Sequence, residues 1–238
     1  MNKIKCLLYV ELYKIRKNKT FFITVIIAVL YGILATLIIG KKISSFYQIS
    51  SFLTNSSIIL LITPIVMDYA NECSVGFFQD AVSIGINRSI IFFIKESFLF
   101  IQAMFVYFFL YLSIYLTSAF KHIPCELDMI ILFRLFLYLS CLFFTGFLIA
   151  VIVERIIPFT VICASLSIIL SIIGTILIRI SVSKYYIYGL NHMIFQKNIS
   201  ISDNKRYIFS AIITFLIIDI IAYLKFNKTE FKSDIQDI

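Results

Sequence analysis

Charged residues are scarce in this chain of 238 residues, of which 14% are Asp, Glu, Lys or Arg and 61% are hydrophobic. A soluble domain usually has about 25% charged and about 45–50% apolar residues. A soluble fold of this size could not hide so much apolar surface, because its exterior still needs polar groups. The composition therefore excludes an ordinary soluble enzyme, a disordered chain and a small disulfide scaffold. Together with a mean hydropathy of +1.00, it predicts an all-α polytopic membrane protein.

Tryptophan is absent, so the 14 tyrosines and 25 phenylalanines must supply any aromatic belt at the membrane interface. The two histidines, His122 and His192, lie far apart without acidic or cysteine neighbours, which gives a metal site little support. The five cysteines form no C-x-x-C pair, and we interpret most of them as small apolar fillers.

Catalytic motifs are also missing. The sequence has no H-E-x-x-H, no G-x-S-x-G, no Walker A glycine loop and no paired carboxylates within a predicted span. We therefore expect no enzyme activity, no ATP site, no metal and no cofactor in this chain itself.

Six apolar stretches predict six transmembrane helices, because each approaches the length of about 20 residues that crosses a bilayer. They lie at about residues 20–39, 51–71, 97–117, 127–153, 158–178 and 207–223. Pro64 falls inside the second stretch and removes a backbone donor there, which predicts a helix kink. The whole chain, 1–238, is expected to form one transmembrane domain.

Six spans place both termini on the same side of the membrane. Six Lys and Arg residues within 1–19 favour the cytoplasmic side, whereas the five within 179–206 oppose it. The net charge of +8 is explained by basic residues at span ends beside anionic lipid, rather than by nucleic-acid binding. Abundant Ile, Lys, Asn and Phe suggest an AT-rich bacterial genome. We expect a multi-pass protein of the bacterial plasma membrane with cytoplasmic termini and an extracellular loop at 179–206.

Residues 1–19 precede the first span and are amphipathic. Their apolar residues recur at helical spacing and make one stripe, formed by Ile4, Leu7, Leu8, Leu12 and Ile15. This pattern predicts a helix on the membrane surface. It is either a simple basic anchor or an elbow helix that positions a transport core.

Two charged residues fall inside predicted spans. Asp219 lies within 207–223, and Arg134 lies near the beginning of 127–153. Charge at bilayer depth is expensive, so each is a candidate functional residue. The alternative for each is a paired or snorkelling structural charge.

The segment 72–96 is amphipathic and would face the cytoplasm. Gly76 and Gly85 allow the backbone to turn, so we expect a short helix between them. Such a helix could present charged and aromatic side chains to the groove of a partner protein. The alternative is an interfacial loop that binds nothing. The candidate docking residues are Glu72, Gly76, Gln79, Asp80, Gly85 and Arg88.

The order Glu72, Gly76, Gly85, Arg88 and Lys95 resembles the cytoplasmic loop of type-2 ABC exporter permeases. In that family an acid and a glycine are followed by a second turn, an Arg and, seven residues later, a Lys. The chain length and the expected six spans agree with this resemblance. It is greatest for the short permease subunits of bacteriocin and lantibiotic self-immunity transporters.

Other parts of the sequence bear on this resemblance. The expected N-terminal helix contains E-L-Y-K-I-R-K from Glu11 to Lys17, which agrees with it. Phe77 departs from the family pattern, where a Thr often follows the glycine. Ile86-Asn87 stands in place of a commoner proline-containing turn. These departures concern the subfamily more than the family.

The resemblance implies a permease subunit that relies on a separate cytoplasmic ATPase subunit to bind ATP and Mg²⁺. Residues 72–88 would be a coupling helix in the groove of that ATPase. A second permease subunit, identical or homologous, would complete the path, and the substrate would be an amphipathic antimicrobial peptide taken from the membrane lipids. One alternative is export of another substrate, such as a drug, a lipid or a different peptide. Another is a membrane interaction protein without transport.

Overall fold

The computed structural model describes residues 3–39, 46–124, 128–153, 194 and 199–229. The predicted span at 158–178 and most of the predicted loop at 179–206 lie outside these ranges. The described part is all-helical and contains no strand. Its helices are α1 (Lys3–Lys17), α2 (Lys19–Ile39), α3 (Phe46–Ser74), α4 (Phe77–Ser83), α5 (Arg88–Phe120), α6 (Met129–Val153) and α8 (Ile201–Lys228).

Four of these helices are long and apolar enough to cross a membrane, namely α2, α5, α6 and α8. Their outward faces are apolar as well. On α2, for example, Ile26, Leu34 and Ile38 are more than half exposed. An exposed apolar surface of this extent is expected where lipid replaces water. The described part is therefore consistent with an all-α, multi-pass membrane protein.

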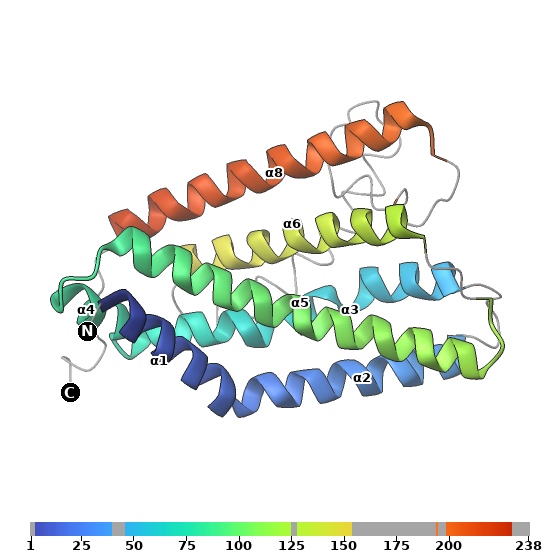
Figure 1. The fold of residues 1–238 in the computed structure, drawn as a ribbon, viewed down its shortest axis with the longest axis horizontal. Helices are drawn as coiled ribbons and strands as arrows, with labels where there is room; N and C mark the ends of the chain where they lie inside the picture. Colours follow the sequence, from blue (N-terminus) through green and yellow to red (C-terminus); the bar gives the residue numbers. More distant parts are fainter. Residues whose placement is uncertain (1–2, 40–45, 125–127, 154–193, 195–198, 230–238) are drawn as a thin grey trace.

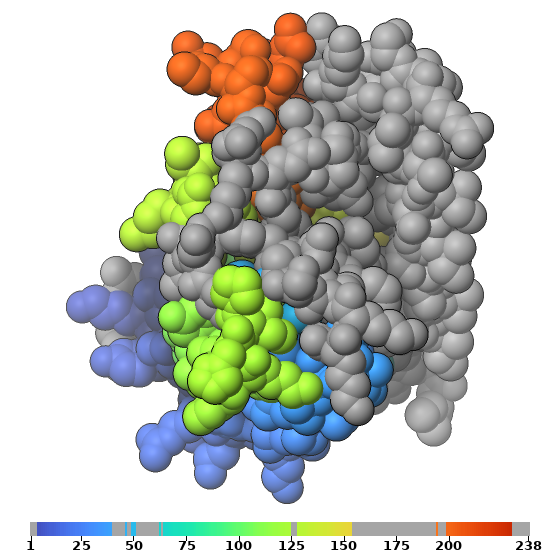
Figure 2. Space-filling model, turned by 90° about the vertical axis from the view of Figure 1, so that its right-hand side faces the viewer, coloured from blue at the N-terminus to red at the C-terminus, as the bar shows by residue number. Residues whose placement is uncertain are grey.

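The long helices run side by side along the long axis of the molecule, and α4 lies at one end with the beginning of α1 and the end of α8 (Figure 1). We call this end the α4 end. Helix α5 is central and packs against α2, α3, α6 and α8, while α8 packs chiefly on α6. Figure 2 views the bundle from the opposite end, where the first residues of α8 (orange) and the α2 and α3 region (blue) occupy opposite edges.

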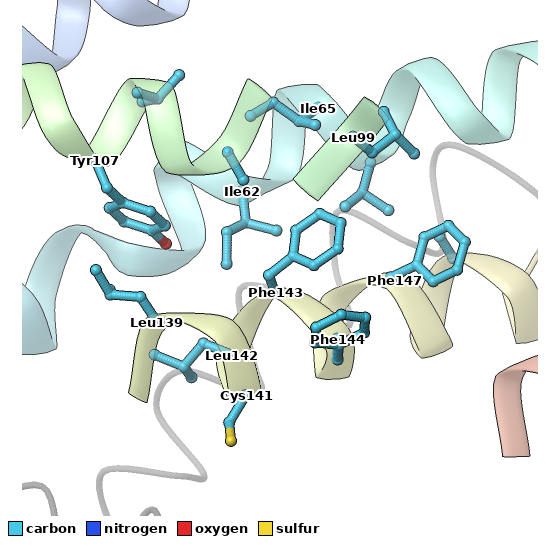
Figure 3. Packing of buried hydrophobic residues seen from close by; sticks show 14 of the residues in the cluster. Ile62, Ile65, Leu99, Tyr107, Leu139, Cys141, Leu142, Phe143, Phe144 and Phe147 are labelled. Carbon is cyan, nitrogen blue, oxygen red and sulfur yellow. The ribbon is translucent and has the colours of Figure 1, made fainter. Parts of the chain in front are cut away.

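The core is formed where α3, α5 and α6 meet. Ile62 and Ile65 of α3 lie opposite aromatic residues of α6, including Phe143 and Phe147 (Figure 3). Phe147 also contacts Tyr69 of α3, with ring centroids 5.3 Å apart. Edge-to-face contacts of this kind add to the stabilisation that burial of the rings provides.

Helix α2 packs on α5 through small side chains. Its buried face consists of Thr24, Ala28, Gly32 and Thr36, spaced four residues apart, with Phe21 beyond. Small residues at this spacing let two membrane helices approach closely. At Gly32 the approach is so close that an added Cβ would lie 2.0 Å from Ser113 Oγ.

The helix bounds differ from the predicted spans where polar residues cap the helices. Helix α5 begins at Arg88 rather than at residue 97, because the side chain of Asn87 accepts a hydrogen bond from Ser89 N. Helix α8 begins at Ile201 rather than at residue 207, because Ser200 caps it by accepting from Asp203 N. Helix α3, at Phe46–Ser74, begins five residues before the predicted span 51–71 and is not among the four helices that are long and apolar enough to cross a membrane. Helices α2 and α6, at Lys19–Ile39 and Met129–Val153, lie close to the predictions.

Candidate functional site

Helix α4 is a separate short helix of seven residues between two glycines, Gly76 and Gly85, which we call its glycine joints. Gly76 and Gly85 have φ values of 79° and 83°, a left-handed conformation that costs glycine little. After α4, the N–H groups of Gly85 and Ile86 donate to the carbonyls of Val82 and Ala81, which is a Schellman ending. The short helix that the glycine spacing predicts is therefore present.

One face of α4 is anchored in the bundle and the other is exposed. The ring of Phe78 is fully buried, 5.2 Å from Tyr69 of α3 and 5.6 Å from Phe226 of α8. Gln79 and Asp80 are exposed on the opposite face. Helix α4 therefore presents a small polar surface, and its position is fixed by contacts with α3, α5 and α8.

A buried ion-pair network lies beside α4. Lys95 Nζ of α5 is 2.8 Å from Glu11 Oε2 of α1 and 2.5 Å from Glu72 Oε1 of α3. Lys14 Nζ approaches the same two carboxylates, at 3.2 Å from Glu11 and 3.1 Å from Glu72. We call Glu11, Lys14, Glu72 and Lys95 the Lys95 network. It joins three helices through charges that balance within the network.

The Lys95 network extends directly to α4. Lys14 Nζ lies 3.3 Å from the ring centroid of Phe77, the first residue of α4, in a cation–π contact. Next to the network, Asn18 donates through its amide to Asp68 of α3 and caps α2 by accepting from Phe21 N. The same polar cluster thus sets the junction of α1 with α2 and supports the start of α4.

Arg88 connects the first residue of α5 with the end of α8. Its guanidinium donates to the carbonyls of Asn227 and Thr229 at 3.0 and 2.9 Å. A cation at a helix C-terminus satisfies carbonyls that have no intrahelical partner. One residue later, the hydroxyls of Ser89 and Tyr223 are 2.9 Å apart. The segment after α4 is thereby fixed to α8.

The structure therefore separates the six predicted docking residues. Glu72 belongs to the Lys95 network, Gly76 and Gly85 are the joints of α4, and Arg88 holds α8. Of these six residues, only Gln79 and Asp80 lie on α4 with exposed side chains.

Glu11 of the Lys95 network was not predicted to be part of the site. It is 2% exposed and, with Leu7, forms the inward face of α1, whereas Leu8 and Leu12 of the predicted apolar stripe are exposed. The available signal was the acid at i+4 from Leu7, within an otherwise apolar and basic helix.

The two predicted intramembrane charges have different surroundings. Arg134 is 3% exposed, and its Nε donates to Asn204 Oδ1 of α8 at 2.9 Å. Tyr207 of α8 donates to the backbone carbonyl of Arg134. This favours the structural interpretation of Arg134, as a link between α6 and α8. Asp219 instead faces the carboxyl group of Glu96. Pro64 lies inside α3, which continues as a helix through it, and the kink stays a prediction.

A largely apolar cavity of about 820 Å³ opens between α3, α5 and α6. Its lining includes Phe100, Met104, Tyr111, Leu135 and Leu139. This volume and lining suit the apolar part of an amphipathic molecule. Within the described ranges, no three His, Cys, Asp or Glu residues are placed to hold a metal ion.

Comparisons with known proteins give no relative for this chain. No protein-family model, no curated protein and no solved structure matches it.

Proposed function

We propose that this chain is the membrane-spanning permease subunit of an ATP-driven exporter, with ATP hydrolysed by a separate cytoplasmic subunit. The observation that supports the proposal best is α4, a seven-residue helix at the end of the bundle where α1 begins and α8 ends. Its buried side is fixed by Phe78, and its exposed side presents Gln79 and Asp80. The order of Glu72, Gly76, Gly85, Arg88 and Lys95 around it resembles that of the type-2 ABC exporter permeases.

The surroundings of α4 suit the transmission of force. A partner docked on Gln79 and Asp80 would push against a helix that is backed by the Lys95 network on one side. On the other side α4 leads through Gly85 and Asn87 into the central helix α5. Closure of an ATPase dimer would thus displace α5 relative to α3. In this proposal α1 is the elbow helix, six spans cross the membrane and both termini are cytoplasmic.

The docking role is tested by charge reversal on the exposed face of α4. We expect Asp80→Lys combined with Gln79→Lys to abolish co-purification with the ATPase encoded beside this gene. Loss of a hot-spot residue at the centre of an interface costs about 2 kcal/mol or more, which is about a 30-fold loss of affinity. Membrane insertion and thermal stability should not change, because both side chains are exposed. Glu72→Arg is less informative, because it would also break the Lys95 network.

Asp203→Lys is the matched control, because Asp203 is a partly exposed acid at the beginning of α8, near the opposite end of the bundle. It should leave ATPase association intact. If the variant with Gln79→Lys and Asp80→Lys bound the ATPase as well as the wild-type chain does, the docking assignment would be overturned. Failure of the wild-type chain to bind any ATPase would favour a membrane interaction protein without transport.

The substrate we propose is an amphipathic antimicrobial peptide, whose apolar side would occupy the cavity between α3, α5 and α6. Met104→Trp should fill part of this cavity and remove most of the protection that the complex gives cells against the peptide. Minimum inhibitory concentrations measure this effect. Leu216→Trp, on the exposed face of α8, should retain protection. Unchanged protection in the Met104→Trp variant would exclude the cavity as the site that binds the peptide. Protection against a drug or a lipid, in place of the peptide, would identify an exporter of a different substrate.

A further inference from the structure

Two carboxyl groups meet inside the bundle, one from α5 and one from α8. The side chains of Glu96 and Asp219 lie within hydrogen-bonding reach of each other. Glu96 is 7% exposed, and its Oε1 receives no hydrogen bond from the described residues. The buried Oδ1 of Asp219 also lacks a donor there. We call Glu96 and Asp219 the carboxyl pair.

The carboxyl pair lies well inside two helices that are apolar enough to cross a membrane. Glu96 follows the first residue of α5 by eight residues, which corresponds to about 12 Å along the axis. Asp219 precedes the last residue of α8 by nine residues, or about 13 Å. Since Arg88 ties these two helix ends together, the two carboxyl groups occupy the same depth.

No described cation neutralises the carboxyl pair. The charged and titratable groups on the neighbouring helices have other partners: Lys95 binds Glu11 and Glu72, Asp68 accepts from Asn18, Tyr223 contacts Ser89, and Cys141 donates to the Ala211 carbonyl. Lys95 lies on a different face of α5 from Glu96, because consecutive residues on a helix do not share a face. The repulsion between the two carboxyl groups must therefore be relieved within the carboxyl pair itself.

A hydrogen bond between two carboxyl groups exists only when one of them donates a proton, because a carboxylate is solely an acceptor. Two carboxylates held in contact and away from water repel each other strongly, whereas one shared proton removes the repulsion. We propose that Glu96 and Asp219 form a proton-binding site that holds α8 against α5. Its ligand is a proton, since two carboxyl groups without a third described ligand do not suit a metal ion.

This site gives the contact between α5 and α8 a pH dependence. With the proton bound, the pair is a hydrogen bond that adds to the Arg88 and Tyr223 contacts nearby. When the proton leaves, two carboxylates face each other across the same contact. The bundle should thus be stabilised at low pH, and this contribution should be lost as pH rises and the proton dissociates. The inference does not depend on the exporter proposal.

Infrared titration of the purified protein in nanodiscs tests the site directly. A protonated carboxyl group has a C=O stretch that is distinct from the carboxylate bands and shifts in deuterium oxide. We expect this band at neutral pH, its loss at high pH, and its absence from the Glu96→Gln and Asp219→Asn variants. Each amide can donate to the remaining carboxylate without a proton, so both variants should fold.

Thermal unfolding over about pH 6 to about pH 10 supplies the second measurement. The wild-type melting temperature should fall as pH rises, and the Glu96→Gln and Asp219→Asn variants should lack this step. Asp203→Asn, which alters a partly exposed acid on the same helix α8, should keep both the infrared band and the step. Absence of the band from the wild-type protein, or its survival in both variants, would overturn the proposal.

Discussion

Lys95→Met should reduce the free energy of unfolding by about 3–5 kcal/mol, the usual cost of breaking a buried ion pair by removing one partner. The Lys95 side chain is only 5% exposed and neutralises Glu11 and Glu72, whose side chains are 3% and 16% exposed. Methionine has a similar length, so the loss measures the charge rather than a cavity. Unfolding in detergent, followed by circular dichroism, measures the difference.

Lys14→Met is the matched control, because it removes a lysine from the same two carboxylates. The Lys14 side chain is 33% exposed, so solvent already screens its charge. We expect a loss of at most about 1 kcal/mol. Equal effects of the two variants would show that Lys95 does not act as the buried counter-ion that joins α1, α3 and α5.

Gly32→Ala should cost about 1–3 kcal/mol, as overpacking of a tight contact does. The new Cβ would lie 2.0 Å from Ser113 Oγ and 3.1 Å from the Leu110 carbonyl oxygen. Ser113 Oγ itself donates to that carbonyl, so it must give up this bond when it rotates away. The same unfolding measurement in detergent applies.

Ser113→Ala supplies the test of mechanism for this prediction. Combined with Gly32→Ala it removes the shortest contact, and the double variant should regain the larger part of the loss. Leu34→Ala on the exposed face of α2 controls for changes in the apolar surface of the helix. Additive effects of the Gly32 and Ser113 substitutions would contradict a direct contact between α2 and α5 at this point.

The sequence predicts helices well where an apolar run has no charge. The predicted span 20–39 agrees with α2, because nothing within Lys19–Ile39 after its first residue is charged. Helix α5 begins nine residues before the predicted span 97–117, and these first nine residues include the charged Arg88, Lys95 and Glu96. Each of these side chains finds a partner on another helix. Hydrophobic periodicity contains no information about such distant partners.

In the candidate site, too, the sequence predicts the features that depend on local chemistry but not those that depend on distant contacts. The left-handed joints at Gly76 and Gly85 follow from local backbone chemistry, and the sequence predicts the short helix between them. The carboxyl pair could not be predicted, because Glu96 and Asp219 lie 123 positions apart and Glu96 was placed outside a span. Which face of α4 is exposed also depends on tertiary contacts, since Phe78 is buried by Tyr69 and Phe226.

The Lys95 network has a consequence for the order in which the chain assembles during synthesis. Glu11 and Glu72 leave the ribosome before Lys95 and have no buried counter-ion until it emerges. Until then, burial of either carboxylate would be costly, so α1 should remain in the headgroup region while α2 inserts. Insertion of α5 then lets α1 dock, and the N-terminal helix is among the last of the first five helices to reach its final position.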